Sequence, residues 1–322
     1  MLKFFSGVVT LTLAAQAATA QPPPFPSRPL RLIVPNGAGG STDFIARTLA
    51  GKLAETLGQQ VIVDNRAGSG GIIGTEIVAR AAPDGYTLLV GTVGNLAISP
   101  HLYRRLPYDA QRDFSAITQI SAAAYVMLVN PALPVKSIPE FIAAAKTTPG
   151  RIAFASAGSG TGSHLSAALF AAVAAVSLTH IPYKGGGPAL TDLIANQVQL
   201  MFNGIPASLA ALSGGRLRAL AVSSPARVAA LAETPTLAEC GLSGAEATSW
   251  TGLLAPAGTA PEIIARLNRA SRAILQLPAV RARLIADGAE PVAGSASAFA
   301  THLHAEYEKW GKVVRLTGAR AD

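Results

Sequence analysis

Two loops of small residues are the parts of this sequence best suited to hold an anion. The first follows LRLIVP and spans Asn36 to Asp43, and the second follows RIAFA and spans Ser156 to His164. In both, backbone N–H groups converge, and the helix that follows adds unpaired donors and the positive end of a dipole. The loops lie well over a hundred residues apart. The sequence therefore predicts two α/β lobes that face each other across a cleft and capture a small anion.

Enzyme motifs are missing from the sequence. It has no G-x-S-x-G, no G-x-x-x-x-G-K-[ST] and no H-E-x-x-H. Gly158-x-Gly160-x-Gly162 begins like a dinucleotide loop, but Ser163 stands where the last glycine of G-x-G-x-x-G is needed. We therefore expect no catalytic residue and no cofactor.

The histidines give no metal-site pattern. His302 and His304 are two residues apart in a helical segment and so face different sides. We expect His101 and His180 to be structural. For His164, at the start of a helix, ligand contact and local hydrogen bonding or packing both remain open.

The first residues predict a cleavable secretory leader. Lys3 precedes an apolar run from Phe4 to Ala18, and Ala18-Thr19-Ala20 is an A-x-A signature. The run is too interrupted by polar residues for a membrane anchor. We expect cleavage after Ala20, which makes residues 1–20 the signal peptide, and a soluble periplasmic protein.

Charge and cysteine content exclude further classes. Without Lys3 the chain keeps 25 of its 26 basic residues against 18 acidic ones, so its formal net charge is about +7. The basic residues form no run with interleaved aromatics, so nucleic acid is not an expected partner. Cys240 is the only cysteine, which excludes an internal disulfide and a cysteine metal site.

Short apolar runs alternate with helical patterns along the chain, which predicts mostly parallel sheets with right-handed crossovers. The expected strands are Leu30–Pro35, Gln60–Asp64, Tyr86–Gly91, Tyr125–Asn130, Ile152–Ser156, Leu178–Pro182, Gln199–Asn203 and Leu217–Ser223. The expected helices between them include Thr42–Leu57, Gly71–Ala81, Ile138–Thr147, Gly162–Ala175 and Gly187–Ala195.

Three further helix signals stand out. Ser137-Ile-Pro-Glu140 and Thr259-Ala-Pro-Glu262 have the pattern of capping boxes with an early proline. Ser297–Leu316 predicts an amphipathic helix whose apolar stripe is core: Phe299, Leu303, Tyr307, Trp310 and Val314.

From Pro26 to nearly the C-terminus the chain closely resembles the substrate-binding receptors of tripartite tricarboxylate transporters, the Bug-type extracytoplasmic solute receptors. The resemblance is carried by RPLRLIVP…GGSTD (28–43), GQQVIVDNRAGSGGIIG (58–74), PDGYTLLVGT (83–92), LPYD (106–109), ASAGSGTGSHL (155–165), THIPYKGGGPALTDLI (179–194), PTLAECG (235–241) and SWTGLLAPAGT (249–259).

This resemblance implies a type II periplasmic-binding-protein fold. Its two α/β lobes would comprise residues 28–123 plus 249–322 and residues 124–248, joined by crossing strands. It also implies a monomeric, non-enzymatic receptor that delivers a small carboxylate to the large and small membrane subunits of a transporter.

The resemblance further implies which residues meet the ligand. Backbone N–H groups, hydroxyls and waters of the two loops would hold the carboxylate. The expected ligand-binding residues are Asn36, Gly39, Gly40, Thr42, Asp43, Thr92, Ser156, Gly158, Gly160, Thr161, Ser163, His164, Tyr183, Lys184 and Asn203. For Tyr183, Lys184 and Thr92, the alternatives are a core position, a solvated turn and a helix cap, respectively.

Three departures from the family pattern bear on the ligand. Asn36 replaces an aromatic residue, Asn203 an acid and Ala168 a glutamate. Together they argue against an amino acid and favour an uncharged or polar carboxylate. Two other readings stay open: a binding module that feeds a sensor, and a secreted α/β hydrolase.

Overall fold

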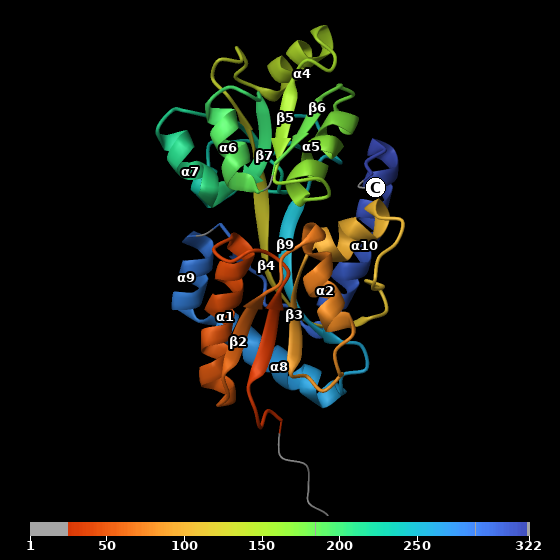
Figure 1. Cartoon of the computed structure of the whole chain (residues 1–322). Coiled ribbons are helices and arrows are strands. Elements are labelled where there is room, and N and C mark those ends of the chain that lie inside the picture. Colours follow the sequence, from red (N-terminus) through yellow and green to blue (C-terminus); the bar gives the residue numbers. More distant parts are fainter. Residues whose placement is uncertain (1–24, 184, 287, 321–322) are drawn as a thin grey trace, which may run out of the picture.

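The chain folds into two α/β halves that two strands connect (Figure 1). The computed structural model describes residues 25–183, 185–286 and 288–320. The connecting strands are β4 (Phe114–Val129) and β9 (Thr248–Pro256). The predicted signal peptide and Lys184 lie outside the described residues.

The lower half in Figure 1 contains the first and the last elements of the described chain, and the C-terminus is marked beside the upper half. Its elements are β1 (Leu30–Val34), α1 (Ser41–Leu57), β2 (Val61–Asn65), η1 (Ser69–Gly71), α2 (Ile72–Ala79), β3 (Thr87–Thr92), η2 (Gly94–Ile98), α3 (Ser99–Leu102), α8 (Pro261–Gln276), α9 (Pro278–Ala286), β10 (Glu290–Pro291) and α10 (Ala296–Thr317).

The upper half is built from the middle of the sequence. Its elements are α4 (Ile138–Thr147), β5 (Ala153–Ser156), α5 (Gly162–Val173), β6 (Thr179–Pro182), α6 (Gly186–Ile194), β7 (Leu200–Gly204), α7 (Ile205–Ser213), β8 (Arg218–Val222) and η3 (Ala229–Leu231).

The two predicted anion-binding loops follow β1 and β5, and the sheet order places both near the junction of the halves. Strands follow the order β2-β1-β3-β9-β4-β7-β5-β6, with β8 and β10 also paired to β4. Pairing is parallel for β1 with β2 and β3 and for β5 with β6 and β7, as the alternating pattern predicts. The connecting strands β4 and β9 pair antiparallel with each other up to Ala124 and Thr248, and from Tyr125 onward β4 pairs with β7 and β8.

Most of the expected elements are found within one or two residues of their predicted bounds. The expected strand Tyr125–Asn130 is the final part of the much longer β4, and β9 and α7 were not among the expected elements. The first part of β4 is rich in alanine and serine, which have little β-propensity, and its register with β9 shifts twice. Its pairing therefore depends on tertiary contacts that local sequence does not show.

One of the two capping boxes is confirmed and the other is wrong. Ser137 Oγ accepts from the Glu140 N–H and caps α4. Thr259 instead donates its hydroxyl to the Pro256 carbonyl at 2.8 Å, and Ala260 is the N-cap of α8. Ala260 has extended backbone with ψ 136°, the conformation favoured before proline.

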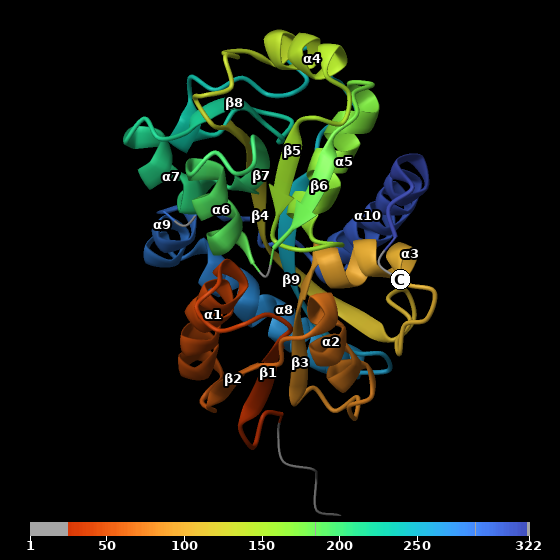
Figure 2. The same ribbon diagram turned by 45° about the horizontal axis from the view of Figure 1, so that its top comes forward.

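Each half has its own core, and a further cluster joins them. Leu165 and Leu169 of α5 pack in one buried cluster with Trp250 of β9 and Trp310 of α10. Figure 2 shows α10 beside α5 on this side of the molecule. Most of the predicted apolar stripe of α10 is core, because Phe299, Trp310 and Val314 are buried in this cluster and Leu303 packs against it. Tyr307 is only half-buried and packs against His101, with ring centroids 4.3 Å apart.

Candidate functional site

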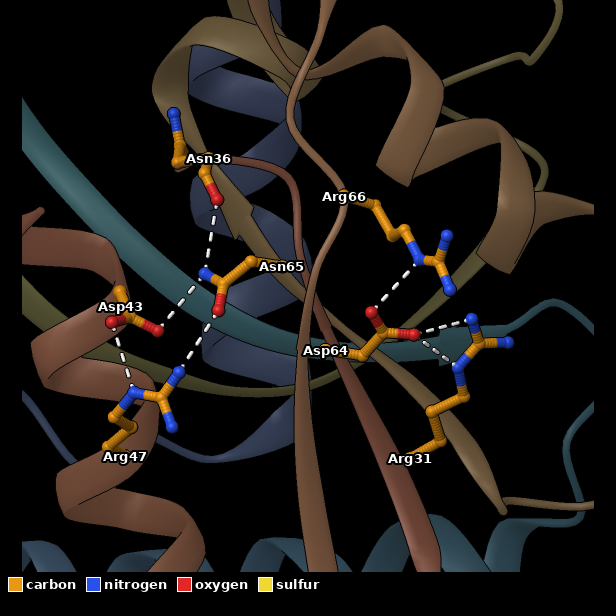
Figure 3. Close-up of polar contacts among 7 residues, drawn as sticks. All are labelled: Arg31, Asn36, Asp43, Arg47, Asp64, Asn65 and Arg66. Carbon is orange, nitrogen blue, oxygen red and sulfur yellow. Dashed lines mark hydrogen bonds and ion pairs between the residues drawn. The ribbon is translucent and has the colours of Figure 1, made fainter. Parts of the chain in front are cut away.

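Asp43 organises the first loop from beneath (Figure 3). Its carboxylate accepts from the Gly39 N–H at 2.9 Å, from Arg47 Nε at 3.0 Å and from Asn65 Nδ2 at 3.0 Å. Burial raises the pKa of Asp43, but these hydrogen bonds and the charge of Arg47 outweigh it and hold the pKa below its usual value. Asp43 is therefore an ionised support for the loop, with its oxygens already engaged.

A second ionic cluster in Figure 3 fixes the strands that carry this loop. Asp64 of β2 accepts from Arg31 Nε of β1 at 2.8 Å and from Arg66 Nε at 2.9 Å. The Asn36 carbonyl accepts from Asn65 Nδ2 at 3.1 Å, so the loop start is tied to the end of β2.

The start of α1 leaves backbone donors open. Its N-cap is Gly40, whose lack of a side chain means that no side chain caps the helix. Helix geometry leaves the first N–H groups, those of Ser41 and Thr42 among them, without a partner inside the helix. These donors and the positive end of the helix dipole are suited to an anion.

The second loop uses many of its donors internally. The N–H groups of Ala157, Gly158 and Gly160 donate to Ser163 Oγ at 3.0 Å, Ser156 Oγ at 3.1 Å and His164 Nδ1 at 3.2 Å. Thr161 caps α5 by accepting from the His164 N–H. These side chains shape the loop, and the donors that helix geometry leaves open are the N–H groups of Gly162 and Ser163.

His164 supports the loop together with His180. Their rings stack with centroids 3.9 Å apart and planes 10° apart, and Phe154 stacks on His180 at 4.8 Å. His180 Nε2 lies 2.7 Å from Ser156 Oγ. Burial lowers the pKa of both imidazoles to about 4, and for His164 the charge of His180 adds to this effect. Both rings are therefore neutral at pH 7, and the ring stacking and the Ser156 contact of His180 fit its predicted structural role.

Other predicted site residues have local partners. Thr92 Oγ1 donates to Asn95 Oδ1 at 2.7 Å, the Tyr183 hydroxyl donates to Asp192 Oδ2 at 2.7 Å, and Asn203 Nδ2 donates to Ser208 Oγ at 3.1 Å. Their assignment to a ligand remains a prediction, as does that of Lys184.

A cavity of about 420 Å³ lies between the halves, in front of the connecting strands. Of the predicted residues, Gly39 and Gly40 line it. Its other walls come from four places: the first turn of α1, the crossover of β4 and β9, the start of α7, and Gly288 beyond the end of α9. The full lining is Gly39, Gly40, Ser41, Phe44, Ala123, Ala124, Tyr125, Gly204, Ile205, Pro206, Ala207, Ser249 and Gly288.

The start of α7 is a part of this site that sequence reasoning missed. Its N-cap is Gly204, again with no side-chain cap, and Pro206 occupies the first turn. The sequence does contain a signal for this helix start, namely a strand that ends in Gly-x-Pro, because proline favours the first turn of a helix. Two uncapped helix starts, α1 and α7, thus line one cavity.

Tyr125 brings the start of α5 close to the same cavity. A Cβ built on Gly162 would overlap the Tyr125 hydroxyl, so this phenol lies directly against the first residue of α5. Burial raises the pKa of Tyr125, so the phenol is uncharged. The described lining has no charged side chain, so the helix starts are what it offers to an anion.

Known proteins resemble the chain over most of its length. The family model described as "Tripartite tricarboxylate transporter family receptor" matches residues 45–319. The protein BugT of Bordetella pertussis is 39% identical over 313 residues, which cover 97% of this chain and 96% of BugT. The UPF0065 protein in the tcbD-tcbE intergenic region of Pseudomonas sp. (strain P51) is 40% identical over 291 residues, 90% of this chain and 86% of that protein.

Solved structures resemble the whole two-half architecture. Rpa4515 of R. palustris with adipate has a TM-score of 0.84 and 37% identity, covering 92% of this chain and 99% of that one. MatC of Rhodopseudomonas palustris with bound malate has a TM-score of 0.81 and 34% identity, covering 90% and 100%. The periplasmic binding protein BugD has a TM-score of 0.81 and 34% identity, covering 92% and 100%.

These findings confirm the predicted resemblance and fold class, and the matching family and structures are binding receptors, not enzymes. Along the described parts of the chain, no helix has both the length and the hydropathy needed to cross a bilayer. The chain belongs to the receptor family of the tripartite tricarboxylate transporters and has the type II periplasmic-binding-protein fold.

Proposed function

We propose that this protein is an extracytoplasmic receptor that closes on a small carboxylate between two lobes and delivers it to a membrane transporter. The lobes would be residues 28–123 with 249–322 and residues 124–248, and the protein would act as a monomer. The proposal rests on the family and on one observation: the cavity at the crossover of β4 and β9 is lined by the uncapped starts of α1 and α7.

The chemistry of the cavity supports a carboxylate. Open N–H donors at two helix starts offer hydrogen bonds to an anion, and both helix dipoles direct their positive ends toward it. Tyr125 and Ser249 add hydroxyl groups, while Phe44, Ile205 and Pro206 offer apolar contact to a carbon chain. A small ligand with an anionic head and an apolar body suits these walls.

Calorimetry with adipate and malate tests the proposal, because two relatives were solved with these ligands. We expect saturable binding of at least one carboxylate at a stoichiometry of one, and no binding of adipamide, the uncharged analogue of adipate. Equal binding of adipate and adipamide would contradict carboxylate recognition. Native mass spectrometry of the freshly purified protein would identify a retained ligand.

Delivery to a transporter is distinguished from delivery to a sensor by the membrane partner. We expect genes for a large and a small transporter subunit beside the gene for this protein, and loss of ligand uptake on deletion of either. A neighbouring sensor gene and unchanged uptake would favour signalling.

We also propose that the mature protein begins at Gln21 in the periplasm. N-terminal sequencing of the periplasmic fraction would give Gln21 if cleavage follows Ala20. Membrane-bound protein that still begins at Met1 would contradict this.

A further inference from the structure

Phe44 separates the cleft from a second cavity. This residue lines the cleft cavity and also a cavity of about 480 Å³ between α1 and α9. In Figure 1 α9 stands beside α1, and in Figure 2 it stands above α1, at the level where the two halves meet. Gly288, just beyond the end of α9, belongs to the cleft lining. The two cavities are therefore neighbours with a shared aromatic wall.

The second cavity is basic, whereas the described cleft lining carries no charge. Arg47, Lys52 and Arg283 line it, with Glu55 as its acid. Arg47 is engaged with Asp43 at 3.0 Å, and Lys52 is paired with Glu55 at 2.8 Å. Among these three cations only one thus lacks a carboxylate partner within the described chain.

That cation is Arg283. Its guanidinium carbon lies 5.0 Å from the centroid of the Phe44 ring, in a cation–π contact. Arg283 is exposed, so no packing against neighbouring side chains encloses its guanidinium. A guanidinium stays charged at every physiological pH and binds a carboxylate in a bidentate manner.

We propose that Arg283 is a specificity-determining residue that binds a second carboxylate of the ligand at the Phe44 edge of the cleft. This inference rests on the proposed receptor function and names its ligand class: dicarboxylates whose first carboxylate lies at the helix starts. The bound ligands named for two relatives, adipate and malate, have two carboxylates each. The three departures from the family pattern favour an uncharged or polar carboxylate, but they leave out Arg283, which lies beyond the quoted family motifs.

The test compares two six-carbon ligands that differ only in the second carboxylate. We expect the wild-type protein to bind adipate more tightly than hexanoate. Arg283→Gln should weaken adipate binding about tenfold in calorimetry and change hexanoate binding less than twofold. Arg283→Lys, which keeps the charge, should recover part of the lost affinity.

Arg281→Gln is the matched control. It removes the same charge from the same helix, two residues away, and Arg281 lines neither cavity. We expect its adipate affinity to stay within twofold of wild type.

Three outcomes would overturn the assignment of Arg283. These are an equal loss for adipate and hexanoate, no loss for either, or a loss of the same size in Arg281→Gln. In each of these the wild-type protein still binds a carboxylate, so the receptor function stands. A wild-type protein that binds no carboxylate would overturn the receptor function as well.

Discussion

Ser163 and Gly160 stabilise the second loop in different ways. Ser163 Oγ is buried and accepts from the Ala157 N–H. Its loss leaves this backbone donor unpaired, which costs about 1–3 kcal/mol of stability. Gly160 has φ +77°, and a Cβ there would lie 2.9 Å from Leu102 Cδ1. A β-branched residue at that position is strained by both its backbone angles and its contacts.

We therefore expect Gly160→Val to abolish carboxylate binding while the protein stays folded by circular dichroism. Ser163→Ala should weaken binding only about tenfold, or about 1.4 kcal/mol. Gly215→Val is the control, because Gly215 also has positive φ but has open space around it. A Gly160→Val variant that binds normally, with Ser163 indispensable, would contradict a loop built on backbone geometry.

The His164 imidazole makes stability depend on pH. Its pKa in the fold is about 4, below the ordinary value of 6.5, so the unfolded chain takes up the proton first. The contribution of this ring to the free energy of unfolding is complete above pH 6.5 and is lost as the pH falls from 6.5 toward 4. For this buried ring the shift corresponds to something on the order of 3 kcal/mol.

Urea unfolding at pH 7.5 and pH 5 measures this loss. His164→Asn removes the titrating ring and can keep an acceptor for the Gly160 N–H, so we expect a smaller loss of unfolding free energy between the two pH values. His304→Asn changes an exposed histidine of α10 and should leave the wild-type slope. Equal slopes in wild type and His164→Asn would show that this ring does not set the pH dependence.

At the residue scale, the sequence identifies the two loops but not what their side chains touch. Glycines and hydroxyl residues at the end of an apolar run predict an anion-binding loop wherever a helix follows. Whether Asp43 faces a ligand or the loop interior depends on Asn65, which β2 brings alongside from a distant position. The pairing of His164 with His180 likewise depends on the register of β5 and β6.

Among the elements, α10 is tied to the connecting strand β9 through one buried carboxylate. Glu306 Oε2 accepts from Trp250 Nε1 at 3.0 Å and from Trp310 Nε1 at 2.9 Å. Trp250 pairs with Ala122 of β4, next to the crossover. The two tryptophans are the only ones in the sequence, so tryptophan fluorescence reports on the surroundings of this contact.

We expect Glu306→Leu to lower the free energy of unfolding by about 2–5 kcal/mol, because two buried indole N–H groups lose their acceptor. Glu306→Gln should lose much less, since one amide oxygen can accept both bonds. Urea unfolding followed by tryptophan fluorescence measures both, with Glu308→Gln on the exposed side of α10 as the control. Equal losses for the leucine and glutamine variants would show that the charge, and not the shared acceptor, is what matters.

The elements that sequence patterns miss are those whose partners are far away in the chain. The parallel strands of each half are rich in β-branched and other apolar residues and are predictable. The first part of β4 and all of β9 instead pair antiparallel with each other, from distant parts of the chain. Their alanine, serine and glycine content suits close crossing of two strands but is weak evidence for a strand in isolation. The α7 start was missed for a related reason, because its role arises only from facing α1 across the cleft.

At the scale of the whole molecule, the contacts between the halves are asymmetric. On one side α5 packs with α10, Trp250 and Trp310 in a continuous apolar cluster. In the cleft the starts of α1 and α7 line an open cavity of about 420 Å³. Because packed side chains resist separation, motion between the halves should open and close the cleft around the α5–α10 contact.

A ligand that bridges α1 and α7 therefore stabilises the closed arrangement by its differential affinity for it. We expect a matching carboxylate to lower the radius of gyration in X-ray scattering and to raise the melting temperature. At a ligand concentration of 100 Kd the linkage amounts to about 2.7 kcal/mol, which corresponds to a shift of a few degrees. Gly160→Val should show neither change at the same ligand concentration. Tight binding to the wild-type protein without a change in compactness or melting would contradict closure around a hinge. A ligand held by one half alone has the same affinity for the open and closed arrangements and so does not favour closure.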